Sequence, residues 1–365
     1  MTYRIVIAGG GTGGHIFPGI AVAKALSEKI KLSEIIFAIG NKPIEKEILA
    51  PYGYKTVSFK IEGIKGKNPY KMAKSLFMIP KSLFQAASFL KEFSPNVVLG
   101  VGGYSSGPVC LAAKLMGIAT AIHEQNSYPG LTNRILNKVV DKIFISFEES
   151  KRFFCHKKTI LTGNPVRETF FDNPESDSYR NDVFTIFVSG GSQGSTAINN
   201  IIITASCLLK EQGLTFKIIH QAGQNDYERI SALYKEKGID AIVFPFIDDI
   251  KKIYAQADVV IARAGASTIF ELAAMGKPSI LIPFPYAAND HQTENARSMA
   301  SCGGAFIIPQ SNADKHNIST IIQNLIADKD TLKRMGDSAK TLAKPDAAEH
   351  ITDELIELGR GKKAI

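Results

Sequence analysis

The sequence predicts an α/β protein made of two doubly wound units in tandem, each a parallel sheet with helices on both faces. Short, continuous apolar runs alternate with helix-length segments, which is typical of such sheets. This alternation starts again near the middle of the chain. The length of 365 residues also suits two domains of about 150 residues each.

Ten apolar runs have the length of buried strands, five in each half of the chain. They cover residues 4–8, 35–39, 97–101, 119–123 and 142–146, then 183–189, 216–220, 241–244, 259–262 and 279–282. Helical patterns separate them, among them 19–28, 107–116, 197–211, 226–237, 250–257 and 267–275.

The domain boundary is expected near Gly163-Asn164-Pro165, before a polar stretch at 172–182 that is typical of a surface linker. We therefore expect one domain over residues 1–164 and a second over 165–345. A break at Lys344-Pro345 precedes a last helix within 346–365, which is expected to pack back on the first domain.

Composition narrows the class of protein. The four cysteines are scattered, without metal-like or CxxC spacing, which favours reduced, buried thiols over a disulfide framework. The first apolar run meets glycine by Gly9, so it reads as a strand rather than a signal peptide, and no run reaches the ~18 apolar residues of a membrane span. We expect a soluble or peripheral protein. Its net charge of +8 favours anionic partners without choosing among them.

Three glycine-rich stretches follow predicted strands, at residues 9–14, 100–107 and 190–194. Glycine lets the backbone approach a ligand, and the helix that follows points free N–H groups at an anion. A tight strand–helix turn is the plainer interpretation of each loop alone. Equivalent loops in both halves favour a diphosphate site.

Two common nucleotide-binding classes fit poorly. Gly9, Gly11 and Gly14 have dinucleotide-binding spacing, but the second strand ends in Gly40-Asn41-Lys42, without the acidic residue that would hold ribose hydroxyls. The GxxxxGK[ST] loop of nucleotide hydrolases is absent from the sequence.

Further motifs follow in order along the chain, and together they carry a resemblance. They are residues 10–15, 102–104, 123–126, 163–167, 190–194, 246–249, 263–268, 271, 283–285 and 290–296. This ordered set resembles the MurG family of glycosyltransferases. The resemblance implies a GT-B fold, with two Rossmann-like domains facing an interdomain cleft, and inversion at the anomeric carbon without a metal or other cofactor.

The resemblance also implies the reaction. The family moves N-acetylglucosamine (GlcNAc) from UDP-GlcNAc to the C4 hydroxyl of N-acetylmuramic acid (MurNAc) in lipid I, the undecaprenyl-pyrophosphoryl-MurNAc-pentapeptide. The products are lipid II and UDP, and the reaction serves peptidoglycan synthesis. UDP-GlcNAc, lipid I, an anionic membrane surface and other wall-synthesis proteins are the partners implied, at the cytoplasmic face of the bacterial inner membrane.

Donor-binding residues are carried over from the family to the matching positions of this chain. Ser192 suits the diphosphate, Ile247 the uracil through backbone groups, and Glu271 the two ribose hydroxyls. Gln292 is expected at the sugar hydroxyls, and Arg167 at the nucleotide-sugar, where a cation would stabilise departing UDP; a surface salt bridge is the alternative for Arg167. The helix start after Gly265 adds Ala266, Ser267, Thr268, Ile269 and Phe270.

The first domain is expected to supply the base and the acceptor site. A base needs a pKa near neutrality, which favours histidine. His15, at the end of the first glycine loop, is the first candidate, although it could instead cap a helix or bind phosphate. His123 is the second candidate and could equally be a buried structural histidine. Asn126 is expected near the acetamido sugar or the acceptor, and Thr12, Gly13 and Gly14 near the donor.

A basic, apolar segment at residues 60–90 suits a membrane surface. Asn68-Pro69 predicts a helix start, and Pro80 a break or kink. Phe84 widens the apolar face. The expected patch is Lys65, Lys67, Lys71, Met72, Lys74, Leu76, Phe77, Ile79, Lys81 and Leu83. A helix packed on the sheet with a solvated lysine face explains the same pattern.

The sequence leaves several other functions open. A UDP-GlcNAc 2-epimerase shares the fold and the donor, a nucleotide-sugar-binding membrane recruiter needs no catalysis, and related transferases move other sugars to other lipids. No aromatic-basic platform or reading helix indicates nucleic acid. The sequence does not choose between the two histidines and does not reveal the oligomeric state.

Overall fold

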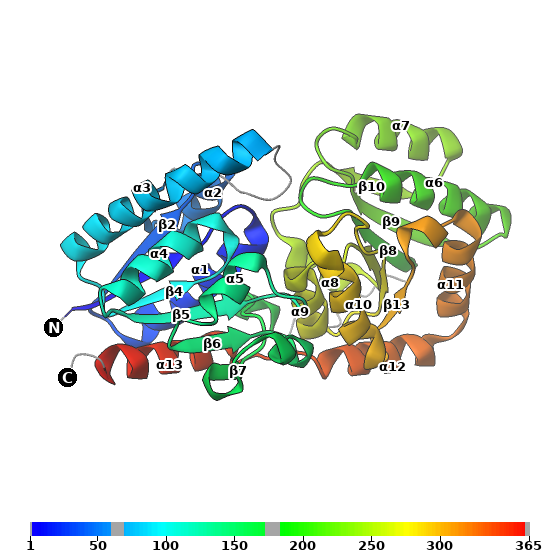
Figure 1. Ribbon diagram of the computed structural model, residues 1–365. Helices are drawn as coiled ribbons and strands as arrows, with labels where there is room; N and C mark the ends of the chain where they lie inside the picture. The colour runs from blue at the N-terminus through cyan, green and yellow to red at the C-terminus, as the bar shows by residue number, and fades with distance from the viewer. Residues whose placement is uncertain (1, 60–68, 172–182, 362–365) are drawn as a thin grey trace. The chain divides into compact units, whose positions relative to one another are not determined.

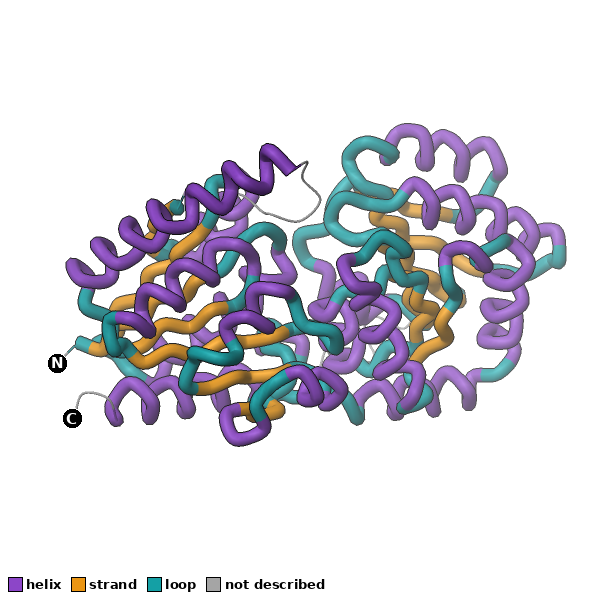
Figure 2. Tube along the Cα trace, viewed as in Figure 1, coloured by secondary structure: helices purple, strands orange, loops and turns teal. Residues whose placement is uncertain are grey.

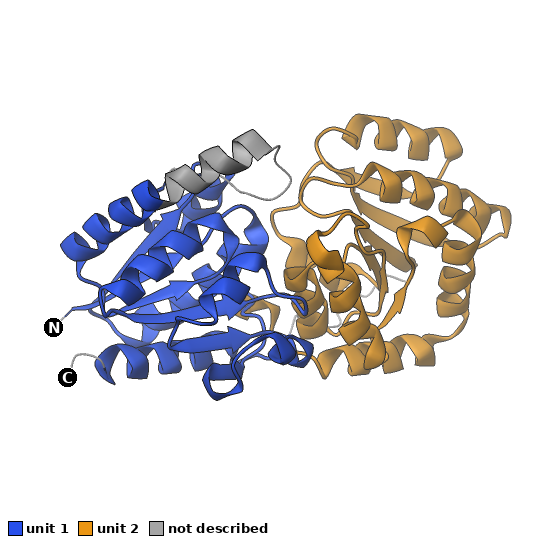
Figure 3. Ribbon diagram, in the orientation of Figure 1, with its two compact units in different colours: residues 1–167, 344–365 blue, residues 168–343 orange. Residues whose placement is uncertain are grey.

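The computed structural model describes residues 2–59, 69–171 and 183–361, with the backbone alone for 69–79. The chain divides into two compact units (Figure 3). Unit 1 comprises Met1–Arg167 and Lys344–Ile365, and unit 2 comprises Glu168–Ala343. The polar stretch 172–182, Lys65 and Lys67 lie outside the described residues.

Unit 1 is built on a seven-stranded parallel sheet with strand order β3-β2-β1-β4-β5-β6-β7 (Figure 1). Its strands are β1 (Tyr3–Ala8), β2 (Ser33–Ile39), β3 (Lys55–Ser58), β4 (Val97–Gly100), β5 (Ala119–Glu124), β6 (Lys142–Ile145) and β7 (Thr159–Leu161). The central strands β1, β4 and β5 are buried on both faces because helices cover both sides.

Two groups of helices cover the two faces of this sheet (Figure 2). Side chains of α1 (Gly13–Lys29), α2 (Pro43–Leu49) and α13 (Ala347–Gly361) pack on Ile5 and Ile7 of β1. Side chains of α3 (Pro69–Phe93), α4 (Gly103–Leu115) and α5 (Leu131–Leu136) join Val6 and Ala8 on the other face. The alternation along β1 follows from the two-residue period of a strand.

Unit 2 repeats this arrangement with a six-stranded parallel sheet in the order β10-β9-β8-β11-β12-β13. Its strands are β8 (Phe184–Ser189), β9 (Phe216–Gln221), β10 (Ala241–Phe244), β11 (Val259–Ala262), β12 (Ser279–Leu281) and β13 (Ala305–Ile307). The helices α6 (Thr196–Glu211), α7 (Tyr227–Lys237), α11 (Lys315–Ala327) and α12 (Lys329–Lys340) share one apolar cluster with it. The remaining helices are α8 (Ile250–Gln256), α9 (Ala266–Met275) and α10 (His291–Ser301).

The two doubly wound parallel sheets confirm the predicted fold class. All ten predicted strands are present, whereas β3, β7 and β13 were not predicted. The predicted starts of α1 and α4 were wrong, because both helices begin inside their glycine loops, at Gly13 and Gly103. No helix in the described parts of the chain has the length and apolar character needed to cross a membrane.

Helix α3 begins at Pro69, as expected, and continues through Pro80 rather than breaking there. Leu83, which was predicted in the membrane-facing patch, is partly buried and packs against the core cluster that contains Ala86 and Leu90, so part of its surface contacts the core rather than solvent. The side chains of Lys71, Met72, Lys74, Leu76, Phe77 and Ile79 lie outside the described residues.

Candidate active site

Each sheet has a switch point, where the strand order turns back beside the first strand of the unit. In unit 1 it lies between β1 and β4, and in unit 2 between β8 and β11. Ligands of open α/β sheets bind beyond the carboxyl ends of strands at such points. The glycine loops after β1 and β4 are therefore the candidate site of unit 1, and the glycine loop after β8 and the segment after β11 are the candidate site of unit 2.

The two glycine loops of unit 1 pack against each other so closely that a Cβ atom would not fit. A Cβ on Gly103 would lie 2.2 Å from the carbonyl oxygen of Gly10, and a Cβ on Gly102 would lie 2.7 Å from Nδ1 of His15. Both glycines also have a positive φ, 93° at Gly102 and 78° at Gly103. The glycines thus bring the backbone of one loop against the side chain of His15.

His15 lies in the first turn of α1 and is half-buried. Its Nδ1 is 2.9 Å from Oε1 of Gln125, which follows β5 directly. Gln125 is only 2% exposed, and its amide nitrogen lies 3.0 Å from both Val101 O and His123 Nδ1. The structure therefore brings the two candidate bases together through one glutamine.

His123 is 1% exposed on β5, and its Nε2 lies 3.2 Å from Gly163 O and 3.2 Å from Ser146 Oγ. Burial lowers the pKa of His123 to about 4, against a weaker opposing effect of the Gly163 carbonyl. A base must reach the proton that it takes from the acceptor. The geometry therefore favours His15 over His123.

Glu124 organises the loop that carries Asn126. Its Oε1 accepts hydrogen bonds from the backbone N–H and the side-chain amide of Asn126, at 3.0 and 3.3 Å. Its Oε2 accepts from Gly130 N at 3.0 Å and from Asn133 Nδ2 at 2.9 Å. The buried Glu124 carboxylate thus fixes Asn126 beside Gln125.

Glu45 is a second buried carboxylate, 2% exposed, which the sequence did not identify as part of the site. It lies on α2, and its Oε1 accepts a hydrogen bond from the backbone N–H of Gly11. Its Oε2 has no hydrogen-bond partner in the described structure. An internal carboxylate therefore already lies at the first glycine loop. Thr12 precedes α1 without a side-chain capping bond to the amides of its first turn, which begins with Gly13 and Gly14.

Arg167, the last residue of unit 1, carries its guanidinium 5.9 Å from the ring centroid of Phe17. Phe17 lies on α1, two residues beyond His15. A Cβ on Gly13 would lie 2.9 Å from the Phe17 ring. The cation is therefore held at the N-terminal part of the helix that carries His15.

In unit 2, Gln221 at the end of β9 connects two predicted donor-binding segments. Its amide nitrogen donates to Gly191 O at 2.9 Å, and its Oε1 accepts from Ile247 N at 2.9 Å. Ser192, in the same glycine loop, is exposed. Because the Ile247 N–H is already bonded to Gln221, a uracil would use the Ile247 carbonyl or displace this bond.

Helix α9 presents its first turn without a side-chain cap at Gly265. Ser267 Oγ is buried there without a partner among the described residues, and Tyr254 donates a hydrogen bond to Glu271 at 3.4 Å. Ala266 and Thr268 belong to the same turn. The side chains of Ile269 and Phe270 are buried in the core, so they cannot contact a ligand. The family resemblance had placed both residues among the donor contacts together with the rest of the helix start.

Arg263 connects several loops of unit 2; it belongs to one of the family motifs, but the sequence did not predict it as a site residue. Its guanidinium donates to the carbonyl oxygens of Ile282 and Pro283, at 3.0 and 3.1 Å. It also donates to Ser195 Oγ at 2.8 Å and Gln310 Oε1 at 2.6 Å. Burial lowers the pKa of Arg263, but an arginine remains charged at neutral pH. A buried cation therefore underlies the glycine loop of unit 2.

The predicted sugar-binding residue Gln292 lies in α10, and its Oε1 accepts a hydrogen bond from Phe284 N at 2.9 Å. Before it, Asn289 and Asp290 both adopt a left-handed backbone, with φ of 56° and 54°. Such conformations are uncommon for residues with a side chain and often occur at ligand sites. No cluster of three or more His, Cys, Asp or Glu suited to a metal occurs in the described part of the chain.

Comparison with known proteins agrees with this architecture. Residues 5–145 match the family model of the glycosyltransferase family 28 N-terminal domain, and residues 185–351 match that of its C-terminal domain. A relative from Syntrophus aciditrophicus is 43% identical over 99% of this chain and 100% of its own length. One from Geobacter sulfurreducens is 44% identical over 97% of this chain and 98% of its own length. Both are named UDP-N-acetylglucosamine–N-acetylmuramyl-(pentapeptide) pyrophosphoryl-undecaprenol N-acetylglucosamine transferase.

Among solved structures, that of MurG from Acinetobacter baumannii is 31% identical and superposes with a TM-score of 0.79, covering 97% of this chain and 99% of that one. The structure of a UDP-GlcNAc 2-epimerase from Neisseria meningitidis superposes with a TM-score of 0.68 at 15% identity, and the match covers 97% of this chain and 100% of that one. At this identity the match shows a shared fold alone. With both domain models matched and relatives above 40% identity along nearly the whole sequence, the chain belongs to glycosyltransferase family 28 and, within it, to the MurG family.

Proposed function

We propose that this protein transfers GlcNAc from UDP-GlcNAc to the C4 hydroxyl of MurNAc in lipid I, which yields lipid II and UDP. The observation that carries the proposal is the 43% identity to a transferase of that name over 99% of this chain. The site is consistent with it, because glycine loops at two switch points provide amides for a diphosphate, and a half-buried histidine provides a base.

The reaction requires three coordinated events. The C4 oxygen of the acceptor attacks C1 of GlcNAc on the face opposite UDP and forms the new glycosidic bond. The bond between C1 and the β-phosphate oxygen breaks, and its electron pair leaves with UDP. The proton of the C4 hydroxyl passes to a base, for which we propose His15, with His123 as the alternative. Its half-buried position leaves His15 accessible, whereas His123 is enclosed.

Unit 2 would hold the donor. The amides around Ser192 and the uncapped start of α9, with Ala266, Ser267 and Thr268, suit the diphosphate. Ile247, Glu271 and Gln292 are the proposed contacts for uracil, ribose and sugar. Arg167 would stabilise the negative charge on departing UDP. The buried cation of Arg263, which hydrogen-bonds to Ser195 beside the glycine loop of unit 2, would add to this stabilisation.

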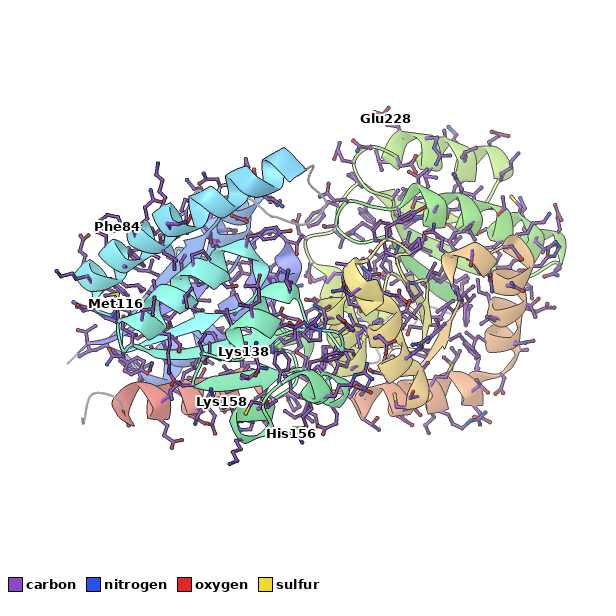
Figure 4. The ribbon with its side chains drawn as sticks, in the orientation of Figure 1. Phe84, Met116, Lys138, His156, Lys158 and Glu228 are labelled. Carbon is purple, nitrogen blue, oxygen red and sulfur yellow. The ribbon has the colours of Figure 1, made fainter. Side chains whose placement is uncertain are left out.

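Unit 1 would hold the acceptor at the cytoplasmic face of the bacterial inner membrane. Large apolar side chains are exposed on, or directly after, the helices α3, α4 and α5 that cover one face of its sheet: Phe84, Leu115, Met116, Leu131 and Ile135. Lys81, Arg134 and Lys138 are exposed on the same helices or directly after them. We call these eight residues the apolar-basic surface; Figure 4 labels Phe84, Met116 and Lys138. Such a surface can enter the headgroup region of an anionic bilayer.

The test is the release of UDP from UDP-GlcNAc, with and without a lipid I analogue, by the wild type and by His15→Ala. Acceptor-dependent release that falls by a factor on the order of 100 or more in the variant is the expected result. If release depends on the acceptor but the variant is unaffected, the base lies elsewhere, and His123→Ala follows. If donor binding is demonstrated but no release depends on the acceptor, the transferase proposal is wrong, and epimerase activity on UDP-GlcNAc is then assayed.

A further inference from the structure

We infer that Gln125 is a positioning residue that fixes which ring nitrogen of His15 carries the proton, so that Nε2 is left as the basic nitrogen. The inference rests on the proposed role of His15 as the base. Gln125 itself is buried and acts through His15 rather than on the substrate.

The first step is the orientation of the Gln125 amide, since oxygen and nitrogen are nearly alike in shape. One end of the amide lies 3.0 Å from Val101 O and 3.2 Å from His123 O. Carbonyl oxygens only accept hydrogen bonds, so this end must be the NH₂ group. The oxygen Oε1 therefore faces His15.

His123 supports the same orientation independently. Its Nε2 faces the carbonyl of Gly163 and the hydroxyl of Ser146, and that hydroxyl donates its own proton to Glu124 O at 3.0 Å. Both neighbours therefore accept, so Nε2 of His123 must carry the proton. Its Nδ1 is then an acceptor, which matches the Gln125 NH₂ group 3.0 Å away.

The protonation of His15 follows from these two steps. Because Oε1 of Gln125 accepts, Nδ1 of His15 must donate across the 2.9 Å that separates them. A neutral imidazole carries one proton, so Nε2 of His15 keeps its lone pair and can take the proton of an acceptor hydroxyl. Without Gln125, the tautomer with the proton on Nε2 would compete with the tautomer with the proton on Nδ1. The Nε2–H tautomer has no lone pair on Nε2 with which to take the proton of the acceptor.

The surroundings hold this arrangement in place. The ring of His15 lies against Gly102, where even a Cβ would come within 2.7 Å of Nδ1. The hydrogen bonds then run in one direction: from His15 to Gln125, from Gln125 to His123, and from His123 to the carbonyl of Gly163. The position of the proton on each of these side chains is therefore set by the hydrogen-bond acceptor that follows it in the chain of bonds.

The experiment compares Gln125→Met with Gln125→Glu. Methionine keeps the approximate length of the side chain but has no oxygen to accept from Nδ1. Glutamic acid keeps an acceptor oxygen, and in its protonated form it also keeps a donor for Val101 O. We expect kcat to fall about 10-fold or more in Gln125→Met with less than about 3-fold change in the KM for UDP-GlcNAc, and Gln125→Glu to recover much of the loss.

The tautomer is measured directly by the ¹⁵N chemical shifts of the His15 ring in the full-length protein. The wild type is expected to show the Nδ1–H form, Gln125→Met a substantial Nε2–H population, and Gln125→Glu the Nδ1–H form. Ser146→Ala is the matched control, because Ser146 hydrogen-bonds to His123 but not to Gln125 or His15 in the described structure, and His15 should keep its wild-type shifts.

A further readout separates positioning from general damage. In the His15→Ala background, Gln125→Met should cost little additional kcat, since the two side chains act as one unit. An unchanged His15 tautomer in a folded Gln125→Met protein, or a full additional loss in the double variant, would overturn the inference. If His15→Ala itself keeps full activity while the wild type transfers GlcNAc, the proposed base is wrong; the ring shifts still report whether Gln125 sets the tautomer.

Discussion

Glu45 shows how a single side chain decides what a glycine loop can bind. Its carboxylate accepts the N–H of Gly11 from within the protein. A Cβ on Gly10 would lie 2.6 Å from the same oxygen, so the loop packs directly against the Glu45 carboxyl group. The equivalent loop of unit 2 instead exposes Ser192. In unit 1 the Gly11 N–H is already bonded within the protein, which supports the placement of the diphosphate of the donor at the loop of unit 2.

Replacement of Glu45 should therefore loosen the first glycine loop. Glu45→Ala removes the acceptor of the partly buried Gly11 N–H and should lower the free energy of unfolding by about 1–3 kcal/mol. Glu45→Gln keeps an acceptor of the same shape and should lose less. Urea titrations followed by circular dichroism measure both variants. Equal losses would mean that the charge, not the hydrogen bond, holds the loop.

His220 makes a prediction about pH. It is fully buried in unit 2, where Nδ1 is 2.8 Å from the Tyr234 hydroxyl and Nε2 is 3.0 Å from Asn199 Oδ1. Burial lowers the pKa of His220 to about 3. The unfolded chain binds this proton near pH 6.5, well above the pH at which the folded protein does. The stability contributed by the neutral side chain is thus complete above pH 6.5 and is lost as the pH falls towards 3.

The expected loss attributable to His220 is on the order of 2 kcal/mol between pH 7.5 and pH 5. His220→Gln removes the titrating group and keeps a donor and an acceptor. Urea titrations at the two pH values should show that the variant loses less stability than the wild type over this range. The same pH dependence in both proteins would show that His220 does not titrate in this way.

At the scale of elements, the sequence predicted what depends on local pattern. Central strands such as β1 and β11 are continuous apolar runs because both faces are covered, and they were found. The unpredicted strand β3 lies at the edge of its sheet and is largely exposed, so its sequence carries no apolar run. The starts of α1 and α4 were missed because their glycines are needed for close loop packing and resemble a turn.

Within the candidate site, the residues that the sequence could propose are those at motif positions, such as His15, Ser192 and Glu271. The roles that it missed depend on long-range contacts. Gln125 meets a side chain 110 positions away, and Glu45 meets a loop 34 positions away. No local pattern reveals either pairing, although Gln125 directly follows β5, whose carboxyl end lies at the same edge of the sheet as the glycine loops.

Helix α13 makes the stability prediction at this scale, because it is the last element of the chain and packs on unit 1. Ile351 and Leu355 are fully buried against α1 and the sheet, and the Tyr3 hydroxyl donates to Leu355 O at 2.8 Å. Leu355→Ala should lower the free energy of unfolding by about 2–5 kcal/mol. Asp353 lies on the same helix as Leu355, and Asp353→Ala, which removes an exposed ion pair with Lys29 of α1, should cost less than about 1 kcal/mol. Comparable losses in urea titrations would mean that the burial of Leu355 contributes little.

At the scale of the whole molecule, the two units surround one strand pattern with different side chains. Both sheets place a glycine loop at the switch point beside their first strand. In unit 1 the surroundings of that loop hold a histidine and a buried carboxylate, and in unit 2 a buried arginine and an uncapped helix start. Positive surroundings suit a diphosphate, and a histidine suits proton transfer. This contrast supports the assignment of donor and acceptor to different units.

The net charge of +8 and the apolar-basic surface together predict how the whole protein meets its lipid substrate. Phe84 is 77% exposed and Ile135 is 62% exposed, on helices of unit 1. Lys81 and Arg134 are exposed on the same helices, and Lys138 is exposed directly after α5. Burial of apolar side chains in the interface should act together with attraction of about 1 kcal/mol per lysine or arginine near an anionic bilayer. The protein should therefore sediment with phosphatidylglycerol vesicles much more than with phosphatidylcholine vesicles, and added salt should weaken the binding.

A Phe84→Glu/Ile135→Glu variant should lower the vesicle-bound fraction several-fold, because it places two negative charges on the contact surface. Ile242→Glu is the matched control: it changes an exposed isoleucine, 43% accessible, on β10 of unit 2, and should bind vesicles like the wild type. With a water-soluble acceptor, the double variant should keep its transfer rate, while with lipid I in vesicles it should lose rate. Equal vesicle binding by all three proteins would place the membrane contact elsewhere, whereas loss of rate with both acceptors would mean that the substitutions damage the fold.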